Sequence, residues 1–184
     1  GAKLYGSISK DNGATWSEPY FVFSSWDDID LISDRNGRIV LLAQNDVSGE
    51  GLVTLTSSNG ITWGDKRKVT PTTANGEAGS IIHASDGYYY VSYSHRYTLD
   101  VPKTDVFVAR SRDLITWETP IQISRGNNFE FDSAMLQTRD GKFYLAYHSY
   151  TDKAVVVVSS NDGVAWNTIH KINITADAHM GINW

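Results

Sequence analysis

The protein has 184 residues, of which 41% are hydrophobic, and its formal net charge at pH 7 is -5. This length fits a single domain with a buried core, and the negative charge gives little support to a phosphate-binding surface, so we expect no nucleic-acid partner. The sequence contains no cysteine, which excludes a disulfide framework, a thiolate zinc site and a cysteine nucleophile. No apolar run approaches the length of a membrane span, and none is predicted.

Four segments of the chain end in tryptophan after a run of small and polar residues. They comprise residues 9–16, 56–63, 111–117 and 159–166, which places successive tryptophans 47, 54 and 49 residues apart. A period of this length fits one four-stranded sheet per repeat and is too long for most helical solenoids. The spacing therefore predicts a repeated all-β architecture.

A second series of turn signals runs in step with the first. Asn36-Gly37, Asp86-Gly87 and Asp140-Gly141 each stand between runs of β-branched and aromatic residues. Such dipeptides favour two-residue hairpins, because both central residues need positive φ. Each repeat is therefore predicted as an inner strand, a hairpin turn, a second strand, a longer loop, a third strand, a tryptophan-ended turn and an outer strand.

Three full repeats of this kind account for most of the chain. Residues 3–22 would supply a third and an outer strand before them, and residues 178–184 the start of an inner strand after them. We predict one domain over residues 1–184, a β-propeller of four-stranded antiparallel blades with about four blades' worth of chain, which forms either a propeller by itself or part of a larger one. Unpaired edges invite association, so residues 3–22 either pair with residues 178–184, or the ring is open and closes through a second copy or further blades.

The first tryptophan-ended turn resembles the Asp box of the bacterial-neuraminidase repeat, S-x-D-x-G-x-T-W, which residues 9–16 match in full. In this alignment the second turn has Ser58 and the fourth has Asn161 at the aspartate position, and the third is one residue shorter and lacks the glycine. The third turn is also similar to the S-x-D-L-x-x-W turn of furanosidase-type glycosidase propellers. The resemblance implies a sialidase-like propeller, a superfamily of sialidases, other glycosidases and non-catalytic propellers.

These turns are interpreted as structural devices. A short Asp or Asn side chain can accept backbone N–H groups in its own turn, glycine supplies positive φ, and tryptophan fills the gap between neighbouring blades. We therefore assign no catalytic role to Asp11, Asp113 or Asn161. Four tryptophans are predicted to be buried against a neighbouring sheet: Trp16, Trp63, Trp117 and Trp166.

Acidic and polar residues gather where each inner strand starts and each second strand ends, on the rim opposite the hairpin turns. The acidic residues at the inner-strand starts are predicted catalytic residues: Asp28, Glu77, Glu130 and Asp132. The polar and aromatic residues of the same rim are predicted to bind substrate: Trp26, His95, Arg96, Tyr97, Arg125, His148, Tyr150 and His179. We expect one mouth on which Asp28, Glu77, Asp132 and His179 converge.

Glycoside hydrolysis uses such groups, with one carboxylic acid protonating the leaving oxygen while a second group attacks or activates water. The sequence leaves retention and inversion of configuration open. The resemblance implies that a true sialidase would hold its substrate carboxylate with three arginines. Only Arg96 and Arg125 fall near the predicted mouth, so sialic acid cleavage is disfavoured and a neutral sugar is expected.

Two other interpretations remain open at this point. The rim carboxylates can be solvated loop residues of a non-catalytic propeller that binds glycans or proteins, or the chain can be an architectural repeat module. In each case we expect an extracellular or cell-surface protein. No cofactor is predicted, although Ca²⁺, which takes several oxygen ligands, is an alternative at Asp28, Glu77, Asp132 and His179.

Overall fold

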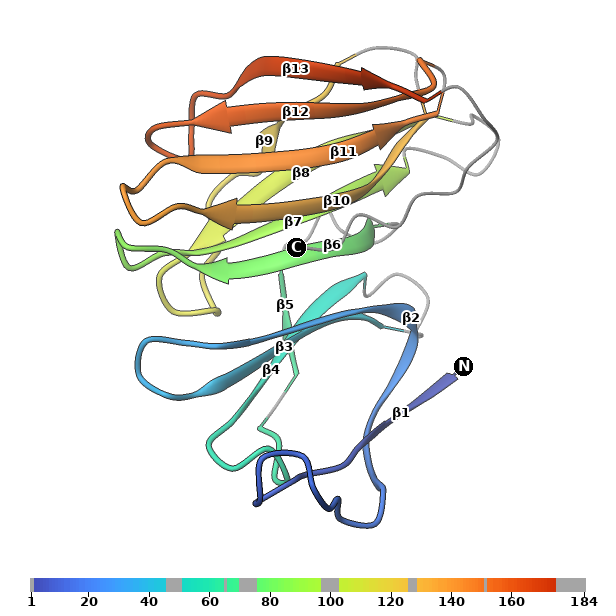
Figure 1. The fold of residues 1–184 in the computed structure, drawn as a ribbon, viewed down its shortest axis with the longest axis vertical. Helices are drawn as coiled ribbons and strands as arrows, with labels where there is room; N and C mark the ends of the chain where they lie inside the picture. Colours follow the sequence, from blue (N-terminus) through green and yellow to red (C-terminus); the bar gives the residue numbers. More distant parts are fainter. Residues whose placement is uncertain are drawn as a thin grey trace.

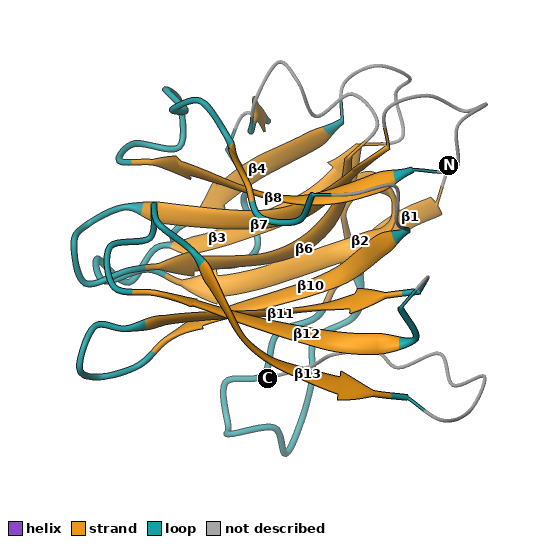
Figure 2. Ribbon diagram, turned by 90° about the horizontal axis from the view of Figure 1, so that it is seen from above, coloured by secondary structure: helices purple, strands orange, loops and turns teal. Residues whose placement is uncertain are grey.

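A computed structural model describes residues 2–45, 51–64, 66–69, 76–96, 103–125, 129–150 and 152–174. Of some strand residues it describes the backbone only: 2, 25–28, 76, 78 and 96. The described residues form thirteen strands in three antiparallel sheets, with no helix among them. Figure 1 shows the three sheets packed side by side, and Figure 2 shows them from above. The predicted all-β fold is confirmed.

The first sheet has the strand order β1-β2-β3-β4-β5. Its strands are β1 (Ala2–Gly6), β2 (Tyr20–Ser33), β3 (Ile39–Asn45), β4 (Leu52–Ser57) and β5 (Arg67–Lys68). The first part of β2 pairs with β1, and the part after Ser25 pairs with β3. One long strand thus joins the expected outer strand of a preceding blade to the inner strand of the next blade, which is why this sheet has five strands instead of four.

The other two sheets have the four strands that the repeat predicts, in the orders β6-β7-β8-β9 and β10-β11-β12-β13. Their strands are β6 (Gly76–His83), β7 (Tyr89–Arg96), β8 (Thr104–Ser111), β9 (Ile121–Gln122), β10 (Glu130–Gln137), β11 (Phe143–Ser149), β12 (Ala154–Ser160) and β13 (Asn167–Asn173). Gly37, Gly87 and Gly141 have φ values of 75°, 82° and 89°. Hairpins lie at the three predicted places, and the β-propeller fold class is confirmed. The predicted two-residue form of the turns is wrong, because only the glycine has positive φ and Asn36, Asp86 and Asp140 do not. In the first turn the Gly37 amide donates to the Asp34 carbonyl at 3.0 Å and the Asp34 amide donates to the Arg38 carbonyl at 2.8 Å, which leaves a three-residue loop.

Alternate residues of each strand face the two neighbouring sheets, so the core lies in layers between blades. One layer, between the first and second sheets, includes Val40, Leu42, Ile81, Val91 and Tyr93. Another lies between the second and third sheets and includes Tyr90, Val106, Val108, Leu145 and Val156. Each fully buried side chain of this size stabilises the fold by roughly 1.5 to 3 kcal/mol.

The inner strands β2, β6 and β10 lie next to one another and are linked by side chains at one repeat position. The Ile81 amide of β6 donates to Asp30 Oδ2 of β2 at 2.8 Å, and the Met135 amide of β10 donates to Ser80 Oγ of β6, also at 2.8 Å. Asp30 and Ser80 both stand seven residues before the glycine of their hairpin turn. The repeat thus places an acceptor where the next inner strand presents an N–H group.

The tryptophan-ended turns correct the alignment made from the sequence. In the second turn Asn59, and not Ser58, accepts two backbone N–H groups on its Oδ1. In the fourth turn Asp162, and not Asn161, does the same. Asp113 repeats the pattern in the third turn, so three turns share one seven-residue form. The first turn, in which Asp11 accepts from Thr15, is the longer exception.

The missing glycine of the third turn has a packing explanation. Gly60 and Gly163 adopt positive φ at the residue after the acceptor, and Leu114 does so at the same position with φ 63°. This backbone is costly for a leucine, but the Leu114 side chain is buried in the layer between the first two sheets. Burial of the side chain offsets the backbone strain.

The prediction that the tryptophans are buried is correct only in part for three of them, which are partly buried, and wrong for Trp16. Trp63, Trp117 and Trp166 each pack against a different layer of the core. Trp16 is 65% exposed. Its turn belongs to the β1–β2 hairpin, which supplies only the outer part of a blade, and the described residues include no inner strands of that blade.

Replacing Trp63 with alanine is expected to lower the free energy of unfolding by about 3 kcal/mol, at the lower end of the range for large aromatic side chains because Trp63 is half-buried. Replacing Trp16 with alanine should change it by less than about 0.5 kcal/mol. Urea unfolding of the two variants beside the wild type measures both values. Equal losses in the two variants would contradict the assignment of Trp63 to an inter-blade layer.

Candidate functional site

Each inner strand carries a register irregularity at the same place in the repeat, near the rim opposite the hairpin turns. The irregularities lie between Ser25 and Ile29 in β2, between Ala78 and Ser80 in β6, and between Phe131 and Ala134 in β10. Bulges of this kind change the direction of a side chain and are common beside active sites. They lie at or beside the positions that the sequence aligns as Asp28, Ala78 and Asp132.

Asp132 lies within the third irregularity and has φ 54°. Aspartate tolerates this left-handed conformation better than most residues, but it is uncommon within a strand. Asp132 is exposed, whereas the next residue, Ser133, is buried. The bulge therefore turns one carboxylate out of the sheet at the rim.

The inner strands approach closely beside this bulge. A Cβ atom added to Gly79 of β6 would lie 2.2 Å from Ser133 Oγ and 2.4 Å from its carbonyl oxygen. Ser133 Oγ in turn lies 3.0 Å from Ser92 Oγ and donates a hydrogen bond to it. Glycine at position 79 thus lets β6 and β10 meet, which brings Glu77 and Asp132 to one rim.

Glu130 and Tyr147 share the rim end of the layer between the second and third sheets. Both side chains are buried, and the Glu130 amide donates to Thr104 Oγ1 of β8 at 2.8 Å. Burial, and secondarily the negative charge of Glu130, raise the pKa of Tyr147. Tyr147 is therefore a neutral phenol at pH 7 and not a phenolate nucleophile.

His95 and Asp105 face each other across β7 and β8 on the other side of the second sheet. Asp105 is buried, accepts a hydrogen bond from Gln122 Nε2 at 2.8 Å and forms an ion pair with Lys103 at 3.5 Å. Burial lowers the pKa of His95, although the Asp105 charge opposes this shift. His95 is thus largely neutral at pH 7. Asp105 is not among the residues predicted for this rim, although its place at the start of a third strand was the available signal.

An aromatic cluster, defined as Phe131, His148 and Tyr150, lies at the rim end of the third sheet. Phe131 and His148 face each other across β10 and β11 with ring centroids 5.0 Å apart. Tyr150 lies 6.4 Å from Phe131 and 6.3 Å from His148, and it is 62% exposed. Two half-buried or buried rings thus support one exposed ring.

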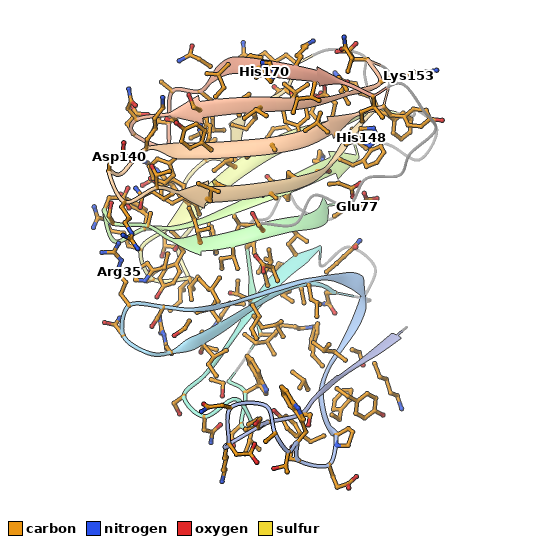
Figure 3. The ribbon with its side chains drawn as sticks, in the orientation of Figure 1. Arg35, Glu77, Asp140, His148, Lys153 and His170 are labelled. Carbon is orange, nitrogen blue, oxygen red and sulfur yellow. The ribbon has the colours of Figure 1, made fainter. Side chains whose placement is uncertain are left out.

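The structure places the described candidates on the predicted rim. Glu77, Glu130 and His95 are at strand ends there, and Figure 3 shows Glu77 and His148 at the end of the sheets opposite Asp140 and Arg35. Arg125 is exposed and follows β9. The other five candidates are not described in full. The structure describes only the backbone of Trp26, Asp28 and Arg96, and Tyr97 and His179 lie outside the described residues. Convergence of Asp28 and His179 with the other residues stays a prediction.

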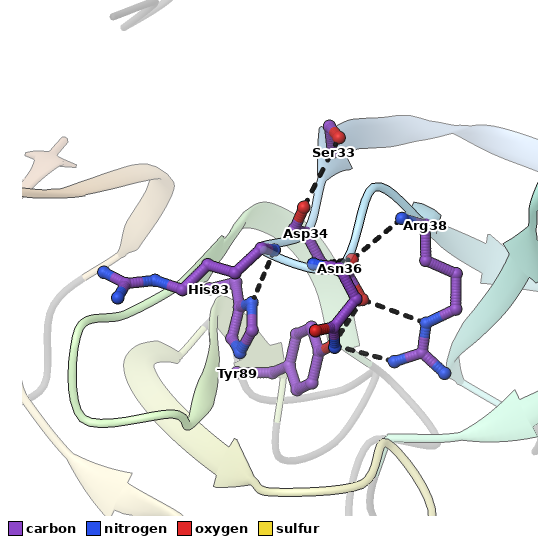
Figure 4. A network of polar contacts seen from close by, with 7 residues as sticks. Ser33, Asp34, Asn36, Arg38, His83 and Tyr89 are labelled. Carbon is purple, nitrogen blue, oxygen red and sulfur yellow. Dashed lines mark hydrogen bonds and ion pairs between the residues drawn. The ribbon is translucent and has the colours of Figure 1, made fainter.

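The opposite rim holds a polar network of structural character (Figure 4). Asp34 is buried and accepts hydrogen bonds from Tyr89 Oη at 2.7 Å and from Arg38 Nε at 2.9 Å. Burial by itself raises the pKa of Asp34, but these hydrogen bonds and those from the backbone of the turn lower it to about 2. His83 stacks on Tyr89 and accepts a hydrogen bond from the Arg35 amide. The network joins the first hairpin turn to the second sheet.

A cleft of about 550 Å³ also opens on this opposite rim, lined by residues that include Asp86, Gln137, Asp140, Lys142 and Asp162. Its carboxylates are held within turns, as where Asp86 accepts from Tyr90 Oη and from the Tyr88 amide. Turn stabilisation accounts for these residues. In the part of the chain that the structure describes, no three His, Asp or Glu side chains are grouped as a metal site would require, and no helix could cross a membrane.

No protein-family model and no curated protein matches the sequence. Among solved structures, the chain is similar to an α-L-arabinanase of Penicillium chrysogenum crystallised with arabinobiose, with 14% identity over 91% of this chain and 58% of that one and a TM-score of 0.66. It is similar to the Hadza microbial sialidase Hz136, with 18% identity, 92% and 40% coverage and a TM-score of 0.67. It is also similar to an endo-arabinase of Bacteroides thetaiotaomicron, with 20% identity, 93% and 73% coverage and a TM-score of 0.66.

The chain spans 58% of the length of the arabinanase from Penicillium and 40% of that of the sialidase. At identities this low the likeness concerns the fold and says nothing about individual residues. The protein therefore shares its propeller fold with carbohydrate-active proteins.

Proposed function

We propose that the protein acts on neutral glycans at the rim where the inner strands start, as a glycoside hydrolase. The observation that carries the proposal is Asp132, an exposed carboxylate in left-handed backbone at the inner-strand bulge. Glu130 and Glu77 stand at the starts of β10 and β6 on the same rim. The likeness to arabinanases and a sialidase supports a glycan substrate at the level of the fold.

Hydrolysis at this rim needs two groups with different tasks. One carboxylic acid gives its proton to the glycosidic oxygen as the bond to the anomeric carbon breaks, and a second carboxylate either attacks that carbon or takes a proton from the attacking water. We assign one task to Asp132, with Glu130 or Glu77 as its partner. Asp28, at the equivalent position of the first inner strand, is a further candidate.

A non-catalytic glycan-binding propeller is the second candidate function. It is favoured by the exposed ring of Tyr150, which offers a contact surface that does not depend on any carboxylate. Both functions imply a protein that meets glycans outside the cell or at its surface. Closure of an open ring through a second copy also stays a proposal.

Incubation with a panel of polysaccharides and aryl glycosides tests the proposal, with release of reducing sugar or aryl alcohol as the readout. We expect turnover of at least one neutral substrate, such as an arabinan or a galactan, and none of a sialoside. Binding of a glycan without turnover would favour the second candidate. Absence of both turnover and binding over the whole panel would overturn the assignment of the rim to glycans.

A further inference from the structure

Tyr150 combines high exposure with a fixed backbone. Its amide donates to the Phe129 carbonyl at 2.9 Å, and its own carbonyl accepts from the Lys153 amide at 3.2 Å. These bonds hold the turn between β11 and β12 against the start of β10. The side chain nevertheless stays 62% exposed, so the turn presents a large apolar ring to the solvent in a defined place.

The two other rings of the aromatic cluster restrict the tyrosine further. Phe131 lies 6.4 Å from Tyr150 with the ring planes tilted by 32°, and His148 lies 6.3 Å away at 71°. His148 is 5% exposed, and among the described residues its Nδ1 atom has no hydrogen-bond partner. These two neighbouring rings limit the positions open to the Tyr150 side chain. A restricted ring loses less conformational entropy on binding, and such preorganisation favours affinity.

The rim around this ring carries charges of both signs. Asp132 and Glu77 lie at the starts of the neighbouring inner strands, and Lys153 and Arg125 are exposed cations near the same rim. The net charge of -5 disfavours an anionic ligand over the molecule as a whole. A ligand that covers Tyr150 should have an apolar face, and an uncharged ligand can approach it without matching these mixed charges.

We propose that Tyr150 is the stacking platform for one neutral pyranose ring of the glycan, held in place by Phe131 and His148. The chemical class is a hexopyranoside with contiguous C–H groups on one face, as in β-linked galactose or glucose. Asp132 follows Phe131 directly in the chain, so the platform adjoins the candidate catalytic carboxylate. The inference deepens the proposed function and rests on it for the position of the sugar.

The test is a calorimetric titration of the full chain with neutral β-galacto-oligosaccharides and β-gluco-oligosaccharides, and with oligogalacturonate as the charged counterpart. We expect the wild type to bind a neutral ligand and not the uronate. Tyr150→Ala should weaken binding by about tenfold or more, the effect of losing one good ring contact. Tyr150→Phe should keep the affinity within about threefold, because stacking needs the ring and not the hydroxyl.

Phe21→Ala provides the matched control. Phe21 is 54% exposed and packs against Tyr5 on the β1–β2 hairpin, so it is a similarly exposed ring elsewhere in the fold, and its removal should leave affinity unchanged. An unchanged affinity in Tyr150→Ala would overturn the proposal, as would an equal loss in Tyr150→Phe.

The failures of the two proposals are distinguishable. Hydrolysis of arabinofuranosides by a wild type that binds no neutral pyranoside would refute the platform and leave the hydrolase standing. Tyr150-dependent binding without hydrolysis of any substrate would refute the hydrolase and leave the platform standing.

Discussion

Replacing Asp34 with alanine is expected to lower the free energy of unfolding by about 3 kcal/mol at pH 7, because removal of one partner from a buried charged network leaves the others unsatisfied. The Asp34 side chain is fully buried, whereas Arg38 is 41% exposed and can regain water, which places the expected cost at the lower end of the usual range. The loss also removes the acceptor of Tyr89 Oη. Urea unfolding followed by fluorescence measures it.

The same variant should have a diagnostic pH dependence. The pKa of Asp34 is lowered from 3.8 to about 2, so the folded state binds this proton less readily than the unfolded chain. Its contribution is therefore complete above about pH 4 and is lost as the pH falls toward 2. The stability difference between wild type and Asp34→Ala should shrink by about 2 kcal/mol over this range.

Lys171 and Asp152 provide the control, because their ion pair has a comparable length of 3.0 Å but both side chains are solvent-accessible. Asp152→Ala should cost less than about 1 kcal/mol, as exposed pairs generally do. A loss in Asp34→Ala no larger than that in Asp152→Ala would contradict the structural role of the network.

Asp132→Asn is expected to reduce glycoside hydrolysis by a factor of about 100 to 10,000, the usual contribution of a group that transfers a proton in the transition state. Asparagine tolerates the same left-handed backbone, so the fold and its melting temperature should be unchanged. Glu130→Gln tests the proposed partner in the same way, with Glu77→Gln beside it.

Asp140→Asn is the matched control for this series. Asp140 is also an exposed aspartate, but it lies in the hairpin turn on the opposite rim, where Thr138 Oγ1 donates to it. The substitution should leave hydrolysis unchanged. Full turnover in Asp132→Asn would remove Asp132 from the proposed mechanism.

Much of the fold could be predicted because the turn chemistry is local. Gly37, Gly87 and Gly141 each need positive φ, and this requirement is visible in the dipeptide that contains them. The seven-residue turns were misaligned because Thr56-Ser57 and Ser159-Ser160 each offer two hydroxyl residues in succession. Only the hydrogen bonds show that Ser57 Oγ and Ser160 Oγ accept the turn amides.

The rim was predicted only in outline, because counting from a turn fixes the end of a strand but not the direction of each side chain. Asp132 and Glu130 are two residues apart, yet one is exposed and the other buried, since the bulge between Phe131 and Ala134 breaks the alternation. The support that Phe131 and His148 give to Tyr150 depends on pairing between β10 and β11. Contacts of this kind have no signal in a single sequence.

The central claim is that ligands bind on the rim where the inner strands start. It is tested most directly by mapping the changes in amide chemical shift when a glycan that the protein hydrolyses or binds is added. The two rims lie at opposite ends of the strands, so assigned amides distinguish them. We predict ligand-induced shifts at Glu77, Asp132 and Tyr150, with the opposite-rim cleft around Asp86 and Lys142 unaffected. Shifts confined to that cleft would contradict the account.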